Sequence, residues 1–566
     1  MAAATPAGTT RPRTGLVLLC AFLGFYLLTA SGHFYSGDEE TLYLVTESLV
    51  ERHTFALPDD AWVDHTARGT HGGLYAQYPP GQSLAAVPFY LLGRAVAVAF
   101  PPDSRGYVTR FCVALFGSVV AALTVALLYR LARSLGFRAA PSLGLAAIYG
   151  VAMPAWPYSR TFFAEPLTAL LLLAAFCALR RGSAPTSPGW LVAAGLAAGA
   201  AVATKPHGAI ALPILGLYLL RRASRPTGEG GGRRAAAARG LRAALWWGAG
   251  LAVVAFPYAA FNAAIYGGSL RTGYSQSVVD LTFDTPLLVG LYGLTISPNK
   301  GLLWYAPPVL LALAGWWWFA RGHVDEAGGW RSPTGQGQHI ARGHADEALA
   351  CLGIALVHLG FYSRHHVWHG DGSWGPRYLT IALPFVALPM VALLDEVRRS
   401  RPLAALVALV ATAGVAVQLL GVLVNFHWYF LYSNEDARRY SPAASPLLYH
   451  ARLVARRTHE WYAQTWPPGD TAQLARGFTQ SEGMAIDGRQ PLFPRWTTGD
   501  GQIILHPAAP EPTVVKVTFF DHRPPALRRE PARVLVDGAP LDAAVVERHD
   551  FSGTGEGWTY QFTVPP

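Results

Sequence analysis

Three adjacent carboxylates, Asp38, Glu39 and Glu40, follow the first strongly apolar stretch of the chain, which covers about residues 15–30. Carboxylates are costly near lipid and are often functional there. A carboxylate at a membrane surface can accept the proton of a hydroxyl group while that hydroxyl attacks an activated carbon. Ser36 and Glu39 fit a capping box that begins a helix, and Glu40 suits the first turn of that helix. Asp38 has no such structural explanation, so it is the favoured base, and Glu39 is the second candidate.

Charged residues further along the chain could complete such a site. Glu165 directly precedes Pro166, so it could either stabilise a helix N-terminus or orient a substrate or metal opposite Asp38. A lipid-linked phosphate leaving group needs fixed donors in a partly dehydrated site, and arginine can supply two of them in parallel. Our candidates for phosphate binding are Arg377, Lys300 and Arg160. Snorkelling of a long side chain at a helix end is the alternative for each.

Polar and aromatic residues of the same predicted loops are candidates for the remaining contacts. We assign substrate binding to Tyr78, His366, Trp374 and Tyr378. His366, His369 and Asp371 have a spacing that could hold a divalent metal, but histidines in an interfacial loop need no ligand role, and we favour a site without metal. The chain has no P-loop, GxSxG or dinucleotide motif in a suitable context, which argues against a nucleotide-driven enzyme or a hydrolase.

The composition of the chain indicates what kind of protein carries these candidate residues. The chain has 566 residues, of which 52% are hydrophobic and 14% are charged, and its mean hydropathy is +0.25. Apolar runs close to the roughly 20 residues needed to cross a bilayer recur along it, which predicts a mainly α-helical polytopic membrane protein. The net charge of +10 comes mostly from arginines between those runs. This pattern fits the positive-inside rule better than a nucleic-acid surface, so we expect a bilayer and no nucleic acid as partner.

A topology with the N-terminus inside places every strongly basic loop on the inner side. It places the loop of residues 31–107, with its acidic cluster, on the outer side together with Glu165 and Arg377. Residues 83–100 are apolar, but counting them as a span would move the basic loops outside, so we expect an interfacial helix there. About eleven spans are predicted, at residues 15–30, 108–129, 141–157, 166–180, 190–204, 208–220, 243–262, 302–320, 348–363, 378–394 and 403–424.

The sequence changes character after about residue 430. Residues 431–484 include an amphipathic stretch and are expected to form an interfacial helix and a linker. From residue 485 to residue 566, short alternating apolar runs are separated by turn-forming residues, which is typical of a β-sandwich. We therefore predict a transmembrane domain over residues 1–430 and an extracytoplasmic β-sandwich over residues 485–566.

The motifs occur in an order that resembles a known group of enzymes. That order is Asp38-Glu39 with Tyr43, then Tyr78-Pro79-Pro80, then Gly93 and Arg110, then Tyr158 to Glu165, and finally Gly375-Pro376-Arg377-Tyr378. Over about residues 12–425 the chain resembles the GT-C superfamily of integral-membrane glycosyltransferases, near its protein O-mannosyltransferase and aminoarabinose transferase branch (family 39/83-like). The C-terminal region resembles carbohydrate-binding sandwiches that are attached to some of these enzymes.

The resemblance implies an inverting transferase that moves a sugar from a polyprenyl-phosphate donor to an acceptor hydroxyl of a lipid, glycan or protein. It implies that Asp38 is the base, with Glu39 beside it, and that Glu165 is the acid of the second outer loop, where many relatives have Asp. Relatives often have a lysine before the Pro-Pro pair, whereas this chain has Gln77-Tyr78, so the resemblance does not extend to a phosphate-binding lysine in that loop.

Two other classes of protein remain as alternatives. A transporter or flippase would favour ionisable residues deep within its spans and repeats of several helices, whereas here the polar residues gather on one predicted face. A non-catalytic scaffold could bind glycans through the β domain alone. The abundant Ala, Gly and Arg suggest a GC-rich prokaryotic genome, so we expect a plasma (inner) membrane, a cytoplasmic N-terminus and a periplasmic or extracellular C-terminal domain.

Overall fold

The structure is a computed structural model of residues 1–566. The residues that it describes are 12–59, 65–182, 187–225, 232–276, 282–321, 344–370, 372–426, 429 and 441–463, together with the C-terminal strands given below. The chain divides into two compact units, and each is described by itself. The first comprises Met1–Val454 and Gly483–Phe493, and the second comprises Ala455–Glu482 and Pro494–Pro566.

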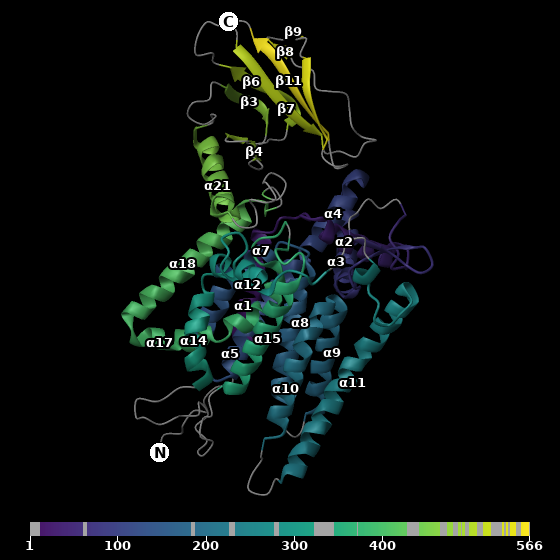
Figure 1. Cartoon of the computed structure of the whole chain (residues 1–566), viewed down its shortest axis with the longest axis vertical. Helices are drawn as coiled ribbons and strands as arrows, with labels where there is room; N and C mark the ends of the chain where they lie inside the picture. The colour runs from purple at the N-terminus through teal and green to yellow at the C-terminus, as the bar shows by residue number, and fades with distance from the viewer. Residues whose placement is uncertain are drawn as a thin grey trace. The chain divides into compact units, whose positions relative to one another are not determined.

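The first unit is mainly helical, which confirms the predicted class of fold (Figure 1). Its α-helices are α1 (Pro12–Leu28), α2 (Gly37–Glu51), α3 (Gly81–Ala97), α4 (Arg105–Ala114), α5 (Phe116–Ser134), α6 (Ala139–Ala152), α7 (Ala155–Tyr158), α8 (Ala164–Gly182), α9 (Pro188–Thr204), α10 (Leu212–Ala223), α11 (Arg233–Tyr266), α12 (Leu287–Thr295), α13 (Leu302–Tyr305), α14 (Val309–Arg321), α15 (Ala345–Arg364), α16 (Leu383–Ala387), α17 (Met390–Glu396) and α18 (Arg401–Leu423). Short 3₁₀ turns join several of them: η1 (Pro102–Ser104), η2 (Pro206–Ala211), η3 (Gly273–Gln276), η4 (Arg377–Ile381), η5 (Val397–Arg399) and η6 (Pro442–Ala444).

Several of these helices have the length and composition of membrane spans. Within the described part of the chain, four apolar helical segments are long enough to cross a bilayer: Pro102–Ser134, Arg233–Tyr266, Ala345–Arg364 and Arg401–Leu423. Shorter apolar helices cover Thr14–Leu28, Ala139–Ala152, Pro188–Thr204 and Val309–Arg321. The protein is therefore a helical membrane protein, whereas a count of eleven spans remains a prediction.

Prolines divide two of the predicted spans. The stretch predicted at 378–394 consists of η4 and the short helices α16 and α17, with Pro384 and Pro389 at the starts of these helices. The stretch predicted at 302–320 is divided between α13 and α14 by Pro307 and Pro308. A proline lacks the backbone N–H that continues a helix, so these interruptions follow from the sequence. Helix α12 was not predicted at all.

Close packing holds the helices of the bundle together. Figure 1 shows α8, α9, α10 and α11 running alongside one another, and direct contacts join α9 to α8 and to α11. Gly195 on α9 and Gly250 on α11 lie at the crossing of these two helices. A Cβ atom at Gly195 would lie 2.1 Å from the Trp247 oxygen, and one at Gly250 would lie 2.1 Å from the Val192 oxygen. Glycine at both positions lets the two backbones approach, as small residues do between membrane helices.

The segment between α1 and α4 is folded rather than extended. It contains α2, α3 and a hairpin in which β1 (Thr66–Arg68) pairs antiparallel with β2 (Leu74–Ala76). Helix α3 covers most of the apolar stretch at 83–100, and its predicted interfacial position stays a prediction. A Cβ atom at Gly81 would lie 2.6 Å from the Ala203 oxygen. The beginning of α3 is therefore packed directly against the end of α9.

The C-terminal region contains the predicted strands. Helix α21 (Pro446–Ala463) precedes them, and its residues are divided between the two units. The strands are β3 (Ala472–Phe478), β4 (Ala485–Asp487), β5 (Gln490–Leu492), β6 (Thr497–Leu505), β7 (Thr513–Asp521), β8 (Leu535–Val536), β9 (Ala539–Pro540), β10 (Ala544–Asp550) and β11 (Glu556–Val564). They form one sheet of order β10-β11-β7 and the pairs β3-β6, β4-β5 and β8-β9, all antiparallel. This pairing does not establish a sandwich, which stays a prediction.

Candidate active site

Four charged side chains, three of them buried and the fourth largely so, meet where four segments of the first unit come together. The Arg377 Nη1 atom lies 2.7 Å from Asp38 Oδ2, and its Nε atom lies 3.1 Å from Glu165 Oε1. Lys205 Nζ donates a 2.6 Å hydrogen bond to Glu165 Oε1. Asp38 lies in the first turn of α2, Glu165 in the first turn of α8, Lys205 directly after α9, and Arg377 at the start of η4. Two acids and two cations thus form one ion-paired cluster, which we call the charge cluster.

Aromatic rings surround the cations of the charge cluster. The Arg377 guanidinium lies 4.4 Å from the centre of the Phe163 ring and 5.2 Å from that of Tyr378. Lys205 Nζ lies 5.1 Å from the same Tyr378 ring. The Tyr378 ring is stacked on Tyr362 with centroids 4.6 Å apart and planes 6° from parallel. These contacts fix both cations in a poorly hydrated setting, where charge interactions are stronger than in water.

The bond between Arg377 and Glu165 is an ion pair without hydrogen-bond geometry. Arg377 Nε is shielded from solvent and has no aligned acceptor among the described residues, although Glu165 Oε1 is near it. One N–H donor of the guanidinium is therefore not used by the protein. An unsatisfied buried donor is costly, and an anion that reached this position would satisfy it.

Asp38 is held ionised by its neighbours. His65 Nε2 lies 3.0 Å from Asp38 Oδ1, and the Tyr78 hydroxyl donates a hydrogen bond to the same carboxylate. Burial alone would raise the pKa of Asp38, but Arg377, His65 and the hydrogen bonds outweigh burial and lower this pKa to about 2. Burial together with the charge of Asp38 raises the pKa of Tyr78 well above its usual value, so this phenol keeps its proton and acts as a donor.

Glu39 has a structural role that the sequence predicted. It completes a capping box by accepting a 3.1 Å hydrogen bond from the Ser36 N–H, and it also accepts one from the Tyr35 N–H. Its second oxygen accepts a hydrogen bond from the Phe162 N–H, which ties α2 to the segment before α8. Burial raises the pKa of Glu39 to about 7, against the opposing effect of these N–H donors. The Glu39 side chain thus holds the start of α2, with Asp38, beside the segment that leads to Glu165. A catalytic role for Glu39 stays a prediction.

A family model covers one part of this site. Residues 106–227 match the model described as dolichyl-phosphate-mannose-protein mannosyltransferase, and this range includes Glu165 and Lys205. Over this range the chain is similar to that family of glycosyltransferases. No curated protein matches the chain.

Two solved enzymes, ArnT and an archaeal oligosaccharyltransferase, resemble the chain only distantly. ArnT from Cupriavidus metallidurans in the apo state has 14% sequence identity and a TM-score of 0.41, with 82% of each chain covered. The same enzyme bound to undecaprenyl phosphate has 16% identity and a TM-score of 0.41, with 81% of this chain and 82% of that chain covered. The apo oligosaccharyltransferase of Archaeoglobus fulgidus has 13% identity and a TM-score of 0.42, with 81% of this chain and 60% of that chain covered. At these scores, no site residue is transferred from them.

The structure brings together five of the residues that the sequence singled out for the GT-C reaction. Arg377 contacts Asp38, Glu165 and Tyr378, and Asp38 in turn contacts Tyr78, so these five residues form one connected group. Their predicted roles in catalysis, phosphate binding and substrate binding are consistent with this geometry and remain proposals.

Other candidates lie elsewhere in the same unit. Arg160 Nη1 donates to the Val422 carbonyl at the end of α18, and its guanidinium faces Tyr35. Lys300 Nζ donates a 2.6 Å hydrogen bond to the Ser373 carbonyl, so it reaches the loop before Arg377. Trp374 is buried, and its carbonyl accepts a hydrogen bond from Tyr158.

The two histidine candidates for a metal site have different neighbours. The His366 side chain is exposed, with its Nδ1 atom 3.7 Å from Asp284 Oδ1, and the ring of His369 contacts Trp368. Asp371 lies outside the described residues. Among the residues that the structure describes, no group of three or more His, Cys, Asp or Glu side chains has the geometry of a metal site. A metal role for these residues stays a prediction.

Three residues of the site were missed in the sequence. Lys205 lies between two predicted spans, and a lysine that interrupts an apolar stretch is a signal that could have identified it. His65 and Tyr274 lie in long polar loops and carry no such signal. A Cβ atom at Gly273 would lie 2.5 Å from the Gln77 oxygen, so η3 lies against the segment before Tyr78. This contact places the Tyr274 ring 5.8 Å from that of Tyr78.

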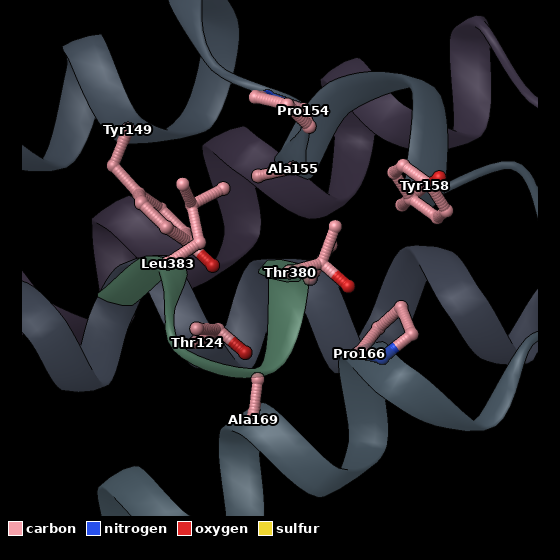
Figure 2. Close-up of a pocket in the computed structure, with 10 residues that line it drawn as sticks. Thr124, Tyr149, Pro154, Ala155, Tyr158, Pro166, Ala169, Thr380 and Leu383 are labelled. Atoms are coloured by element: carbon pink, nitrogen blue, oxygen red, sulfur yellow. The ribbon is translucent and has the colours of Figure 1, made fainter. Parts of the chain in front are cut away.

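A small cavity lies next to the charge cluster. Figure 2 shows Tyr158, Pro166, Thr380 and Leu383 around it, and its volume of about 20 Å³ is close to that of one water position. Pro166 follows Glu165 in the chain, and the Thr380 hydroxyl donates a 2.6 Å hydrogen bond to the Arg377 carbonyl. The cavity is too small for a sugar.

Proposed function

We propose that the protein transfers a sugar from a polyprenyl-phosphate donor to an acceptor hydroxyl, with inversion at the anomeric carbon. The observation that supports this most directly is the charge cluster, in which Asp38 and Glu165 share Arg377 and Lys205 neutralises Glu165. The cluster combines the two elements that such a reaction needs: a carboxylate next to an attacking hydroxyl and fixed cations next to a departing phosphate.

The cations are suited to the donor phosphate. A polyprenyl-phosphate sugar is a phosphodiester with one negative charge, and the leaving lipid phosphate gains a second charge as the sugar departs. Arg377 and Lys205 lie beside the same Glu165 oxygen, at 3.1 Å and 2.6 Å. We propose that these two residues bind the phosphate and that Lys300 supports the loop carrying Arg377. A fixed donor that faces the charge developing on a leaving group typically raises kcat by roughly 10²–10³-fold.

The reaction then follows from bond changes at one carbon. The O–H bond of the acceptor breaks as its oxygen forms a bond to the anomeric carbon, on the face opposite the phosphate. The bond from that carbon to the phosphate oxygen breaks, and its electron pair stays on the lipid phosphate. The acceptor proton goes to the basic group of the site, a function that depends on Asp38. Tyr78 and Tyr378, which contact Asp38 and Arg377, are proposed to bind the sugar. No nucleotide is consumed, because the phosphate ester bond itself is the activated bond.

We place this chemistry at the outer face of a plasma membrane, with the N-terminus inside and the C-terminal unit outside. The charge cluster lies at the starts of α2, α8 and η4 and at the end of α9, so one face of the bundle carries the whole site. The arginine-rich ends of α8 and α10 carry Arg180, Arg181, Arg221 and Arg222 at their opposite termini. This arrangement agrees with the positive-inside rule. The acceptor is a lipid, glycan or protein hydroxyl, and the C-terminal unit is proposed to bind glycans.

The test is a transfer assay with purified full-length protein in detergent. Labelled polyprenyl-phosphate hexoses and pentoses are incubated with and without a hydroxyl acceptor, and cleavage of the donor and formation of product are measured. Asp38→Asn keeps the shape of the side chain but removes its charge, so it is expected to lower transfer by at least about 100-fold. Its elution in size-exclusion chromatography should match that of the wild type.

The same assay separates the rival functions. A fully active Asp38→Asn protein would contradict the assignment of Asp38. Movement of an intact donor across vesicle membranes, without cleavage by the wild type, would indicate a flippase or transporter instead. Glycan binding by the C-terminal unit without any donor cleavage would indicate a scaffold.

A further inference from the structure

His65 is placed against Asp38 by an unusual backbone conformation. Its φ angle is +64°, in the left-handed region that residues other than glycine rarely adopt. The Gln77 N–H donates a 2.9 Å hydrogen bond to the His65 carbonyl, which holds this residue at the edge of the β1–β2 hairpin. Left-handed backbone at a non-glycine residue is strained and is often found at functional sites. Here this conformation directs the imidazole Nε2 atom to within 3.0 Å of Asp38 Oδ1.

The contact with Asp38 decides which nitrogen of His65 carries the hydrogen. An ionised carboxylate can only accept hydrogen bonds, so the Nε2 atom beside it must be the donor. In a neutral imidazole the lone pair is then on Nδ1. This atom is shielded from solvent and has no hydrogen-bond partner in the part of the chain that the structure describes. The lone pair of His65 Nδ1 therefore accepts no hydrogen bond from these residues. The His65 ring lies 6.0 Å from the ring of Tyr78, which contacts Asp38.

We propose that His65 and Asp38 act together as the general base, with His65 Nδ1 taking the proton of the acceptor hydroxyl. This inference rests on the proposed glycosyl transfer. The acceptor O–H bond breaks, its proton forms a bond with Nδ1, and the acceptor oxygen bonds to the anomeric carbon. The carbon–oxygen bond to phosphate breaks, and its electrons leave with the lipid phosphate. The resulting imidazolium ion is stabilised by the Asp38 carboxylate, so Asp38 stays essential while it acts through His65.

The surroundings of Asp38 suit it to this supporting role. Arg377 lies 2.7 Å from its other oxygen, and together the neighbours keep the pKa of Asp38 near 2, against the effect of burial. A carboxylate that holds a proton so weakly is an inefficient base near neutral pH, because proton transfer is best when the pKa of the base lies close to the working pH. It is well suited to orienting a histidine and to stabilising its charged form.

The experiment compares two substitutions of His65 in the full-length protein with the same transfer assay. Glutamine can keep a donor near the position of Nε2 but cannot take up a proton, so His65→Gln should lower kcat by at least about 100-fold. His65→Gly tolerates the left-handed backbone and leaves space for a free imidazole, so added imidazole should restore transfer in a saturable way. His53→Gln is the matched control, because His53 also has a positive φ angle of 53° but is exposed at the end of α2.

The possible outcomes separate a failure of the His65 inference from a failure of the proposed glycosyl transfer. Near-normal transfer by His65→Gln would mean that His65 only orients Asp38, and it would overturn the inference. Failure of imidazole to restore a His65→Gly protein that elutes and binds donor as the wild type does would overturn it as well. A wild type that cleaves no polyprenyl-phosphate donor would refute the proposed function and this inference together. A wild type that transfers while both His65 variants remain active would refute only the inference.

Discussion

Neighbouring carboxylates at the start of α2 have different surroundings and therefore different roles. Asp38 faces Arg377 and His65, and it is ionised at the centre of the charge cluster. Glu39, one residue later, turns the other way and accepts backbone N–H groups from Ser36 and Phe162. Asp38 is ionised and faces the site, but its low pKa makes it a weak base. Glu39 ties the start of α2 to the segment before α8. Rotation by about 100° per residue along a helix is enough to separate the two roles.

Glu39 makes a prediction about stability and pH. Its pKa is raised from 4.5 to about 7 in the folded protein, chiefly by burial, so folding favours its protonated form. The resulting stabilisation is fully present below pH 4.5 and is lost as the pH rises through about 7, a change on the order of 3 kcal/mol. We expect the difference in unfolding free energy between the wild type and Glu39→Gln to change in this direction between pH 4.5 and 7. Thermal unfolding in detergent at several pH values measures it, and a constant difference would contradict the prediction.

The elements that carry the site could be foreseen only in part. The capping residues predicted the start of α2, and Pro166 predicted the start of α8, because both signals are local. The convergence of these helices with η4 depends on packing between distant segments, which spacing in one sequence does not reveal. Lys205 was overlooked for this reason, since its partner Glu165 is 40 residues away. His65 was overlooked because a left-handed histidine in a loop has no sequence signature.

Gly81 makes a prediction at the scale of these elements. A Cβ atom at this position would lie 2.6–2.7 Å from backbone atoms of Ala203 and Thr204, which cannot move independently of α9. We expect Gly81→Ala to displace the start of α3 from the end of α9, and with it Tyr78 and Lys205. Transfer activity should fall by at least about tenfold, since displacements near 1 Å can cost up to 10²-fold, and the melting temperature should fall as well.

Gly106→Ala is the matched control for this substitution. Gly106 lies in helix α4, and a Cβ atom there would meet no atom within 4 Å. Alanine is also the better helix former, so this variant should keep its activity and its melting temperature or gain slightly in stability. Equal effects of the two substitutions would show that the contact between α3 and α9 does not position the site.

At the scale of the whole transmembrane unit, the two ends of the bundle differ in chemistry. One end gathers the charge cluster, with its acids and cations balanced and buried. The other end has an excess of arginine, where Arg222 and Arg225 pair with Glu347 and Asp346 at the start of α15. A balanced, dehydrated cluster suits a reaction in which charge moves from an acceptor to a phosphate. An excess of arginine suits contact with the cytoplasmic side of a membrane. The difference between the two ends therefore supports both the proposed orientation in the membrane and the proposed position of the reaction.

This difference predicts which loops an impermeant thiol reagent can reach. The natural cysteines Cys20, Cys112, Cys177 and Cys351 are first replaced by alanine or serine, and single cysteines are then introduced at His53 and Gly232. Both positions are exposed, and they lie on opposite predicted sides of the membrane. In intact cells His53→Cys should be labelled, whereas Gly232→Cys should be labelled only after permeabilisation. Labelling in the reverse order would place Asp38 and the charge cluster on the inner face. The donor would then have to be used from the cytoplasmic leaflet, and the proposed outer-face reaction would be wrong even if transfer itself were measured.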